Sequence, residues 1–410
     1  MLKSVNKIVG NNMKSISKDF TLNLFASIIS TGTIQLVLYP VIAAHISAAS
    51  YGILLTLMGL ANTVAAAVGG SLNNTRLLLN CEYEKKKLCG DFNLILFIAI
   101  IIVTIACPFF VVNFDEANII LIFLLIAFTD LSIIRSYISV AYRIKLNFKR
   151  ILCSNIIVAI GSLIGLVIFL ISKQSALWVF PFLLGELCGD IYIGLTTDIL
   201  REDYRATKMF AKTINKEFIL LITTLSANLL TYLDRLLLLP LLGGEAVTTY
   251  TVASVFGKSL GIVMTPLAGV LLSYYAQKNY VMNRRKFWKQ NITVLVLALG
   301  MVVISAVLAG PLTGVLYPSA IEAAMPYLLI ANITAIINVI GNMTQPVVLK
   351  YAPTIWQLVI QCIYCCEYLI LGILFTNANG LLGFAIAALI AAASKTILLY
   401  FIGHIYLRGK

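Results

Sequence analysis

Residues 18–40 read KDFTLNLFASIISTGTIQLVLYP, and residues 216–240 read KEFILLITTLSANLLTYLDRLLLLP. Each stretch begins with a basic and an acidic residue before a phenylalanine, continues through a long and mostly apolar run, and ends at a proline. A tyrosine follows shortly after each proline, Tyr51 in the first copy and Tyr250 in the second. The same pattern at the start of each half predicts an internal repeat.

Apolar runs of similar length recur roughly twelve times along the chain, and each is long enough to cross a bilayer as one helix. A helix rises about 1.5 Å per residue, so about 20 apolar residues span a hydrocarbon core of ~30 Å. Because the runs are continuous, they differ from the short alternating segments of a transmembrane barrel. We expect the crossings, in chain order, at residues 20–44, 51–75, 92–112, 117–140, 151–172, 176–197, 218–242, 246–273, 291–314, 321–347, 354–376 and 380–403.

The composition excludes the soluble and disordered classes of protein. The chain of 410 residues is 60% hydrophobic and 11% charged, with a mean hydropathy of +0.96, whereas a soluble globular chain carries about 25% charged residues. The sequence therefore predicts an all-α integral membrane protein with about 12 transmembrane helices. No segment between the runs is long enough to fold as a soluble domain, so we expect the function to lie within the bilayer.

The repeat predicts two bundles of six helices each. Six crossings return the chain to its starting side, so the repeats should be parallel, with the binding site between the halves. We expect a basic amphipathic segment over residues 1–19, a first bundle over 20–197, a linker over 198–217, a second bundle over 218–403 and a tail over 404–410.

The distribution of charge predicts the orientation of the chain. About 25 of the 30 Lys and Arg residues lie at the N-terminus, in the even-numbered turns or in the C-terminal tail, and the opposite turns hold Lys173 together with several acidic residues. This asymmetry is the positive-inside signal, which places both termini in the cytoplasm. The net charge of +13 is thus explained by orientation, and we expect no nucleic-acid partner.

Sequence motifs of enzymes and metal sites are missing from the chain. There is no GxxxxGK[ST] phosphate-binding loop and no recognisable Ser/His/Asp set. The eight cysteines are accompanied by only two histidines, and we interpret them as small buried apolar side chains. We therefore expect no catalytic residue, no metal ion and no cofactor besides a coupling ion.

Acidic residues within the predicted crossings are candidates for ion coupling, because ionisable groups in a membrane are costly. Glu186 and Asp190 lie four residues apart on one helix face. Two close carboxylates in a low dielectric cannot both ionise cheaply, which suits binding and release of H⁺ or Na⁺. The alternative is a structural pair that is compensated by Arg135 or Lys395. The further candidates are Asp130, Asp234 and Glu367.

Basic and amide side chains in the crossings are candidates for substrate binding. Arg235 could bind a phosphate through its guanidinium fork, and Lys258, Lys395 and Arg76 could add positive charge. Adjacent residues point about 100° apart on a helix, so Arg235 and Asp234 are not expected to pair with each other. Salt bridges between helices are the alternative for each cation. The amides, Asn62, Asn338 and Asn342, could contact sugar hydroxyls or form hydrogen bonds between helices.

Two regions carry a resemblance to a known family. Residues 39–52, which begin with Tyr-Pro and end with Tyr-Gly, continue to GGSLNNTR at 69–76, and residues 232–235, YLDR, continue through LLGG at 241–244 to Tyr250. Both regions are similar to bacterial polysaccharide repeat-unit flippases of the multidrug/oligosaccharidyl-lipid/polysaccharide exporter superfamily. In layout the resemblance covers nearly the whole chain, although its motifs are diffuse.

The resemblance implies a MATE-like fold, with two six-helix bundles around a central cavity. It implies a flippase in the bacterial cytoplasmic membrane that moves undecaprenyl-pyrophosphate-linked repeat units of O-antigen, capsule or another exopolysaccharide. Transport would follow alternating access, driven by H⁺ or Na⁺, with the pyrophosphate at Arg235 and Lys258 and the lipid tail in the bilayer. The polysaccharide polymerase and glycosyltransferases are candidate partners. The acidic residues of the first half depart from the cationic cavity that the family implies.

Other functions remain compatible with the same layout. A MATE-type cation-coupled drug or metabolite antiporter would need an aromatic and acidic pocket, for which Tyr39, Tyr51, Tyr250 and Phe256 are candidates. A sugar transporter of the major facilitator class should carry a basic signature where this chain has NCEYEK at 80–85. A membrane scaffold that recruits a polymerase or a glycosyltransferase is the alternative without transport.

Overall fold

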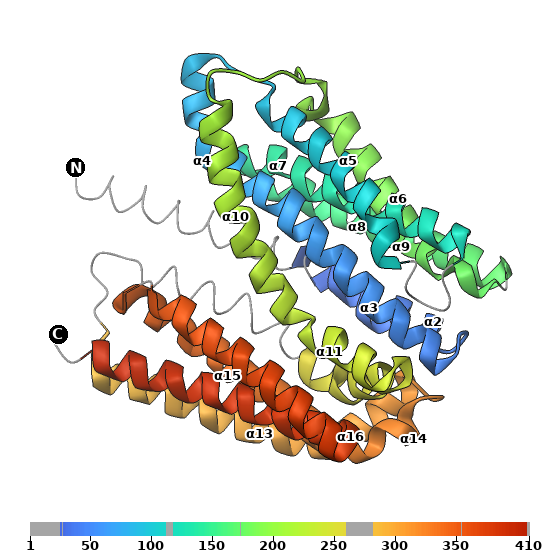
Figure 1. Ribbon diagram of the computed structural model, residues 1–410, viewed down its shortest axis with the longest axis vertical. Coiled ribbons are helices and arrows are strands. Elements are labelled where there is room, and N and C mark those ends of the chain that lie inside the picture. The colour runs from blue at the N-terminus through green and yellow to red at the C-terminus, as the bar shows by residue number, and fades with distance from the viewer. Residues whose placement is uncertain are drawn as a thin grey trace, which may run out of the picture. The chain divides into compact units, whose positions relative to one another are not determined.

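The described part of the chain is mostly helical, with short connecting loops, and contains no strand (Figure 1). The structure is a computed structural model, and it describes residues 25–26, 28–111, 118–172, 174–259, 282–353 and 355–407. The expected basic segment 1–19 lies outside these residues. The chain divides into two compact units, which we call unit 1 (Met1–His45 and Thr56–Leu233) and unit 2 (Ile46–Leu55 and Asp234–Lys410).

Unit 1 holds the helices of the first half and one helix of the second. They are η1 (Thr33–Leu38), α2 (Tyr39–Ala43), most of α3 (Ala48–Ala65), η2 (Ala66–Gly70), α4 (Ser71–Lys86), α5 (Asp91–Val111), α6 (Ile119–Ile138), α7 (Val140–Ile144), α8 (Phe148–Ser172), η3 (Ser175–Val179), α9 (Phe180–Thr196), η4 (Ile199–Arg201) and α10 (Phe210–Thr231). Both η1 and η2 are π-helical turns. The buried core includes Leu72, Phe92, Ile133, Tyr137 and Ile193.

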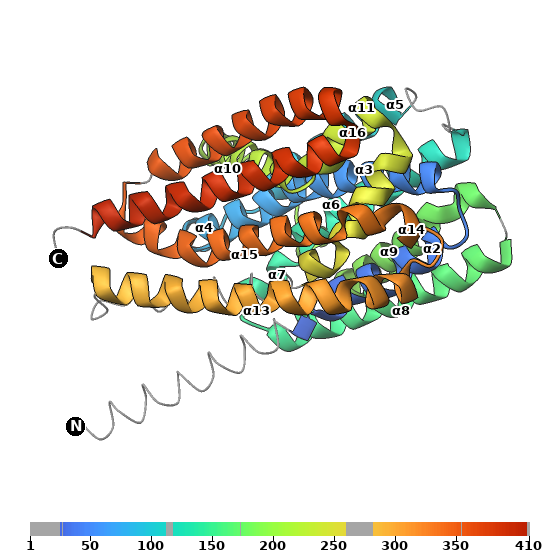
Figure 2. The same ribbon diagram turned by 90° about the horizontal axis from the view of Figure 1, so that it is seen from below.

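Three long helices of unit 2 lie side by side (Figures 1 and 2): α13 (Arg284–Leu316), α15 (Leu328–Tyr351) and α16 (Ile355–Tyr406). The unit also contains α11 (Leu233–Leu242), a helix over residues 244–259, and the short elements α14 (Ile321–Ala324) and η5 (Met325–Tyr327). The helix α16 contains two predicted crossings, because Asn379 and Gly380 depart from helical geometry at the expected boundary. Gly380 adopts φ +58°, which a glycine tolerates without steric cost.

Lengths and hydropathy agree with the expected membrane spans. Eight described helices are long and apolar enough to cross a membrane, or nine if α10 and α11 form one bent span. The first and eighth predicted crossings extend into residues outside the described part. Helix α13 exposes Ile292, Val296, Val303 and Val307, an apolar face that suits contact with hydrocarbon rather than water.

The boundary between the units differs from the predicted linker at 198–217. Helix α10 was expected in the second bundle, but it packs against α4 and η2 in unit 1. Unit 2 begins at Asp234, in the first turn of α11. Polar contacts between α10 and α4 hold α10 in unit 1. The periodicity of the sequence does not reveal these contacts.

Residues 46–55 belong to unit 2 because they pack on the helix at 244–259. The hydroxyl of Thr248 donates to the Ala48 carbonyl at 2.5 Å, and a Cβ on Gly52 would lie 1.9 Å from the Gly244 carbonyl oxygen. The hydroxyl of Tyr51 also donates to that of Tyr317 at 3.5 Å. Burial raises the pKa of Tyr317 to about 12, so this phenol stays protonated at neutral pH.

Candidate functional site

An ion pair occupies the first turn of α11 in unit 2. The Nζ atom of Lys258 lies 2.5 Å from Oδ2 of Asp234, and the other oxygen, Oδ1, accepts from the Arg235 backbone N–H at 2.9 Å. The Asp234 side chain is 9% exposed and that of Lys258 is 38% exposed. The sequence assigned Asp234 to ion coupling and Lys258 to the substrate, whereas the structure joins the two residues.

The Arg235 guanidinium contacts a backbone carbonyl of α3. Its Nη1 donates to the Leu55 carbonyl at 3.1 Å within unit 2. The expectation that Asp234 and Arg235 do not pair through their side chains is therefore met. The guanidinium is held by a neutral carbonyl here, so its positive charge is not cancelled by this contact.

Four buried rings form what we call the aromatic cluster: Tyr250, Phe384, Tyr368 and Tyr364. Phe384 lies edge-on to Tyr250, with ring centroids 5.0 Å apart, and its centroid is 5.8 Å from that of Tyr368. The Tyr364 and Tyr368 centroids are 5.7 Å apart. Only Tyr250 was named from the sequence, because the other three lie on α16, and no spacing links them to Tyr250.

A lysine lies at each end of the aromatic cluster. The Nζ atom of Lys258 is 6.0 Å from the centroid of Tyr250, and that of Lys395 is 5.0 Å from the centroid of Tyr364. Both distances are within the range of cation–π attraction. Lys395 is half-buried and forms no salt bridge with any described residue. Of the two lysines, Lys395 therefore has no neutralising carboxylate within the described chain.

The remaining candidates of unit 2 make local contacts. Glu367 accepts from the Ser394 hydroxyl at 3.0 Å, and its other oxygen is buried without a described partner. Asn338 donates to the Thr334 carbonyl of its own helix at 3.2 Å. The side chain of Asn342 is half-buried. The structure thus places these three on α15 and α16 without joining them into one site.

In unit 1, Arg135 neutralises Glu186. Its Nη2 lies 2.9 Å from Oε1 of Glu186, and its Nε also contacts Oε2. This is the structural alternative foreseen from the sequence, with Arg135 as the partner. Asp190, one turn further along α9, is different, because both of its carboxylate oxygens are buried without a hydrogen-bond partner in the described chain.

The other two candidates on the helices of unit 1 have few contacts. Asp130 accepts from the Thr104 hydroxyl at 2.9 Å, and its second oxygen is buried without a described partner. Asn62 is half-buried on α3. Neither residue is joined to Glu186 and Asp190 by a hydrogen bond in the described chain.

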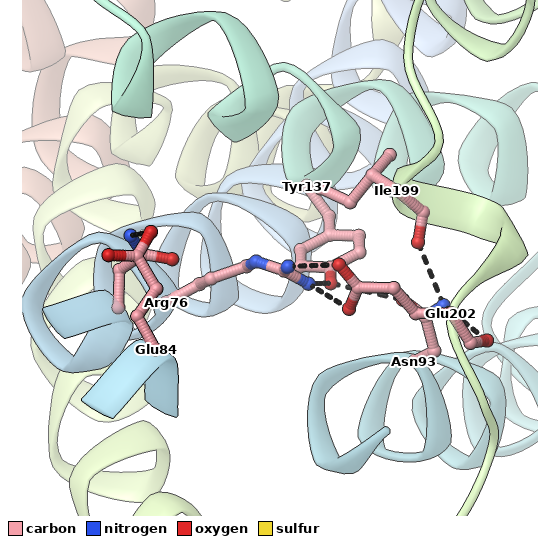
Figure 3. A network of polar contacts seen from close by, with 7 residues as sticks. Arg76, Glu84, Asn93, Tyr137, Ile199 and Glu202 are labelled. Carbon is pink, nitrogen blue, oxygen red and sulfur yellow. Dashed lines mark hydrogen bonds and ion pairs between the residues drawn. The ribbon is translucent and has the colours of Figure 1, made fainter. Parts of the chain in front are cut away.

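Both terminal nitrogens of Arg76 take part in a polar network of unit 1 (Figure 3). Its Nη2 and Nη1 contact Glu202 at 2.5 and 2.9 Å, and Nη1 also donates to the Tyr137 hydroxyl at 2.7 Å. Asn93 extends the network by donating to the Ile199 carbonyl at 2.9 Å. Glu202 and Ile199 belong to the segment after α9, so Arg76 anchors that segment. The expected role of Arg76 at the substrate has no support in these contacts.

Two buried carboxylates escaped the sequence reasoning. Asp91 accepts from the Thr207 backbone N–H at 2.6 Å and from the Tyr83 hydroxyl at 2.6 Å. Glu217 on α10 accepts from the Thr75 hydroxyl at 2.7 Å and also contacts the Ser71 hydroxyl. In the sequence, Glu217 was noted only as part of the repeated basic–acidic–phenylalanine start of each half, and Asp91 was not singled out. The only available signal was the placement of Ser71 and Thr75 four residues apart on one helix.

Among the described residues, no group of three or more His, Cys, Asp or Glu side chains is placed to hold a metal ion. The cysteines of this part of the chain are free thiols.

Comparison with known proteins gives the fold. No family model matches the chain, and no curated protein matches it. An inward-facing multidrug resistance MATE family transporter of the MOP superfamily is similar in structure, with a TM-score of 0.71 and 14% identity over 95% of this chain and 94% of that chain.

Two further solved structures show the same similarity. The lipid II flippase MurJ, in an inward closed conformation, matches with a TM-score of 0.67 and 15% identity over 95% of this chain and 86% of that one. A mutant form of the Vibrio cholerae MATE transporter VcmN matches with a TM-score of 0.63 and 15% identity over 97% of this chain and 98% of that one. The expected all-α membrane fold of MATE type is thereby confirmed.

Proposed function

We propose that this chain is an ion-coupled transporter that flips undecaprenyl-pyrophosphate-linked oligosaccharide units across the bacterial cytoplasmic membrane. The observation that carries the proposal is the environment of Lys395. Its charge lies in a predicted crossing, faces the Tyr364 ring and has no carboxylate partner in the described chain. A half-buried cation within a predicted crossing is costly unless an anion joins it, and pyrophosphate is such an anion.

Lys258 and Arg235 would contribute further positive charge. Lys258 forms an ion pair with Asp234, but the Lys258 side chain is 38% exposed. An incoming phosphate could therefore compete with Asp234 for the ammonium group. Arg235 has a carbonyl rather than a carboxylate at Nη1. Moving a charged headgroup through hydrocarbon unaided is very costly, and these cations would lower that barrier while the lipid tail stays in the bilayer.

Asp190 is the residue that we propose for coupling to H⁺ or Na⁺. Both of its oxygens are buried without a described partner, whereas the neighbouring Glu186 is neutralised by Arg135. A carboxylate that forms no salt bridge and no hydrogen bond in the described chain can bind and release a cation during each transport cycle. Asp130 and Glu367 each have one buried oxygen without a described partner, and they are weaker candidates for the same role.

The MATE-type antiporter is the second candidate, and the aromatic cluster favours it. Tyr250, at one end of this cluster, has the Lys258 ammonium 6.0 Å from its ring centroid, and the same ammonium pairs with the buried Asp234. Rings beside a carboxylate suit an organic cation. The two candidates differ in the charge of the substrate, because the flippase requires Lys395 to stay free for an anion, and the antiporter requires Asp234 to be released from Lys258.

The cellular setting follows from the same proposal. The positive-inside pattern supports cytoplasmic termini and a location in the bacterial inner membrane. The polymerase and the glycosyltransferases that make and consume the repeat unit would be neighbours of the protein. These partners are proposed from the substrate alone.

A deletion strain of the source bacterium tests the proposal. We expect loss of surface polysaccharide and accumulation of undecaprenyl-pyrophosphate-linked units on the cytoplasmic face, with recovery on re-expression of the wild-type chain. Normal polysaccharide together with new sensitivity to cationic drugs would contradict the flippase and favour the antiporter.

A further inference from the structure

Glu217 lies in the first half of α10, where this helix packs against α4 and η2. The residue is 6% exposed. Its Oε2 accepts from the Thr75 hydroxyl at 2.7 Å, and its Oε1 is in short contact with the Ser71 hydroxyl. Four residues earlier on α10, the Thr213 hydroxyl lies 2.5 Å from that of Tyr83. A row of polar side chains therefore joins α10 to α4.

Ser71 directly follows the π-helical turn η2. π-helical turns often mark functional positions. The Ser71 hydroxyl lies against three oxygens: it is in short contact with the Ala67 carbonyl, it is 3.1 Å from the Val68 carbonyl, and it is in short contact with Oε1 of Glu217. Each carbonyl oxygen can only accept a hydrogen bond, so the hydrogens in this group can be counted.

The count favours a proton on Glu217. A serine hydroxyl has one hydrogen to donate. If it donates to the Ala67 carbonyl, the hydrogen between Ser71 and Glu217 must come from the carboxyl group. If Glu217 were ionised, one of the two short contacts of Ser71 would join two acceptors with no hydrogen between them. A neutral carboxyl group satisfies both short contacts of Ser71, since it donates from Oε1 while Ser71 donates to the Ala67 carbonyl, and it also accepts from Thr75 at Oε2.

No described cation compensates a negative charge at this position. On α10, Lys212 pairs with Glu82, and Lys216 forms no ion pair with a described residue. On α4, Arg76 pairs with Glu202. η2 has no ionisable residue, and the nearest acidic group of α5, Asp91, is held by Tyr83 and Thr207. An ionised Glu217 would therefore be a buried carboxylate stabilised only by hydroxyl groups.

We infer that Glu217 is a proton-binding site and that the bound proton fastens α10 to α4. When the carboxyl group ionises, its proton leaves to the solvent and the hydrogen between Oε1 and the Ser71 hydroxyl is lost. The Ser71 hydrogen can then serve either the carboxylate or the Ala67 carbonyl, but not both. Water must enter to solvate the charge, which separates α10 from α4. The proton-binding site is inferred from the contacts of Glu217 alone. A role for its proton in ion coupling rests on the proposed function.

Infrared difference spectroscopy on the full-length protein in lipid nanodiscs tests the inference without a transport assay. Wild-type protein at neutral pH should show a C=O stretching band from a protonated carboxyl group that is lost as the pH is raised. Glu217→Gln should lack this component, because a glutamine side chain donates to Ser71 and accepts from Thr75 without titrating. The glutamine variant preserves both contacts and should elute as folded protein in gel filtration.

Glu82→Gln is the matched control. Glu82 also links α4 to α10, through Lys212 at 2.6 Å, but it is exposed. The control should keep the titrating band, which separates a general weakening of the helix contact from loss of the proton. Identical carboxyl bands in wild type and Glu217→Gln would overturn the inference. Loss of the band on addition of NaCl at constant pH, but not of choline chloride, would also overturn it and identify Na⁺ as the bound ion.

Discussion

The Nζ atom of Lys258 lies 2.5 Å from Oδ2 of Asp234, although 24 positions separate the two residues in the chain. This pair combines a residue expected to bind an anion with one expected to bind a cation. Either ligand must compete with the partner side chain. The pair therefore separates the two candidate functions, because an anionic substrate would displace Asp234 from Lys258 and a cationic one would displace Lys258 from Asp234.

Asp234→Asn should destabilise unit 2, because it removes the carboxylate that holds Lys258. The double variant Asp234→Asn/Lys258→Gln should recover part of the loss, with a coupling energy of about 1–3 kcal/mol for residues in contact. Thermal unfolding of the purified single and double variants measures this energy. Additive effects of the two substitutions would mean that the ion pair contributes nothing to stability.

Asp190→Asn should change how transport depends on pH or Na⁺ and leave folding intact. Its carboxylate makes no hydrogen bond in the described chain, so the amide removes a titrating group without breaking a contact. Glu186→Gln should behave in the opposite way and lower thermal stability, because it removes the charge that holds Arg135. Ion dependence that is unchanged in Asp190→Asn but altered in Glu186→Gln would reverse the two assignments.

Gly52→Ala should destabilise the protein by about 1–3 kcal/mol, the usual cost of forcing extra atoms into a packed contact. The added Cβ would lie 1.9 Å from the Gly244 carbonyl oxygen, so the backbone must shift. Gly300→Ala on α13 is the matched control, since nothing lies within 4 Å of its Cβ position. Melting temperatures of the two variants provide the comparison, and an equal effect would contradict the close packing of Gly52.

Glu202→Gln should make the segment after α9 more susceptible to proteolysis, because it weakens the contact of that segment with Arg76. Limited proteolysis followed by mass spectrometry measures the cleavage rate between α9 and α10. Asp198→Asn is the control, because its ion pair with Arg201 is exposed on both sides, with 84% and 75% of the side chains accessible, and such pairs add little stability. Equal cleavage of both variants would show that the network of Figure 3 does not anchor the segment.

Much of the fold could be predicted from the sequence, because the length and hydropathy of an apolar run identify a membrane helix. The break at Asn379 and Gly380 falls where two predicted crossings meet, since an asparagine and a glycine between apolar runs are typical of a helix end. The assignment of α10 to unit 1 could not be predicted. It depends on contacts of Glu217 with Ser71 and Thr75, which lie more than 140 positions away in sequence.

The candidate site was only partly predictable, because its contacts also join residues that lie far apart in the sequence. The cost of burying charge identified Asp190, Asp234, Lys258 and Lys395 as unusual residues, but the choice of partner depends on which helices pack together. Arg76 shows the difference, because its sequence position suggests the mouth of a helix, and the structure gives it Glu202 as a partner. Likewise, three rings of the aromatic cluster come from α16, and nothing in their spacing connects them to Tyr250.

In the proposed flippase, the ammonium group of Lys395, which has no carboxylate partner in the described chain, receives an anionic lipid-linked oligosaccharide. Proteoliposomes loaded with a fluorescent undecaprenyl-pyrophosphate-linked oligosaccharide test it most directly, with Lys395→Gln compared to Lys350→Gln, whose ammonium also faces a ring, that of Tyr351, at 5.6 Å. We predict that wild type and Lys350→Gln move the lipid and that Lys395→Gln is slower by about tenfold, as expected for loss of one charge-assisted contact. Equal rates for Lys395→Gln and wild type, or no flipping above protein-free vesicles by the wild-type chain, would contradict it.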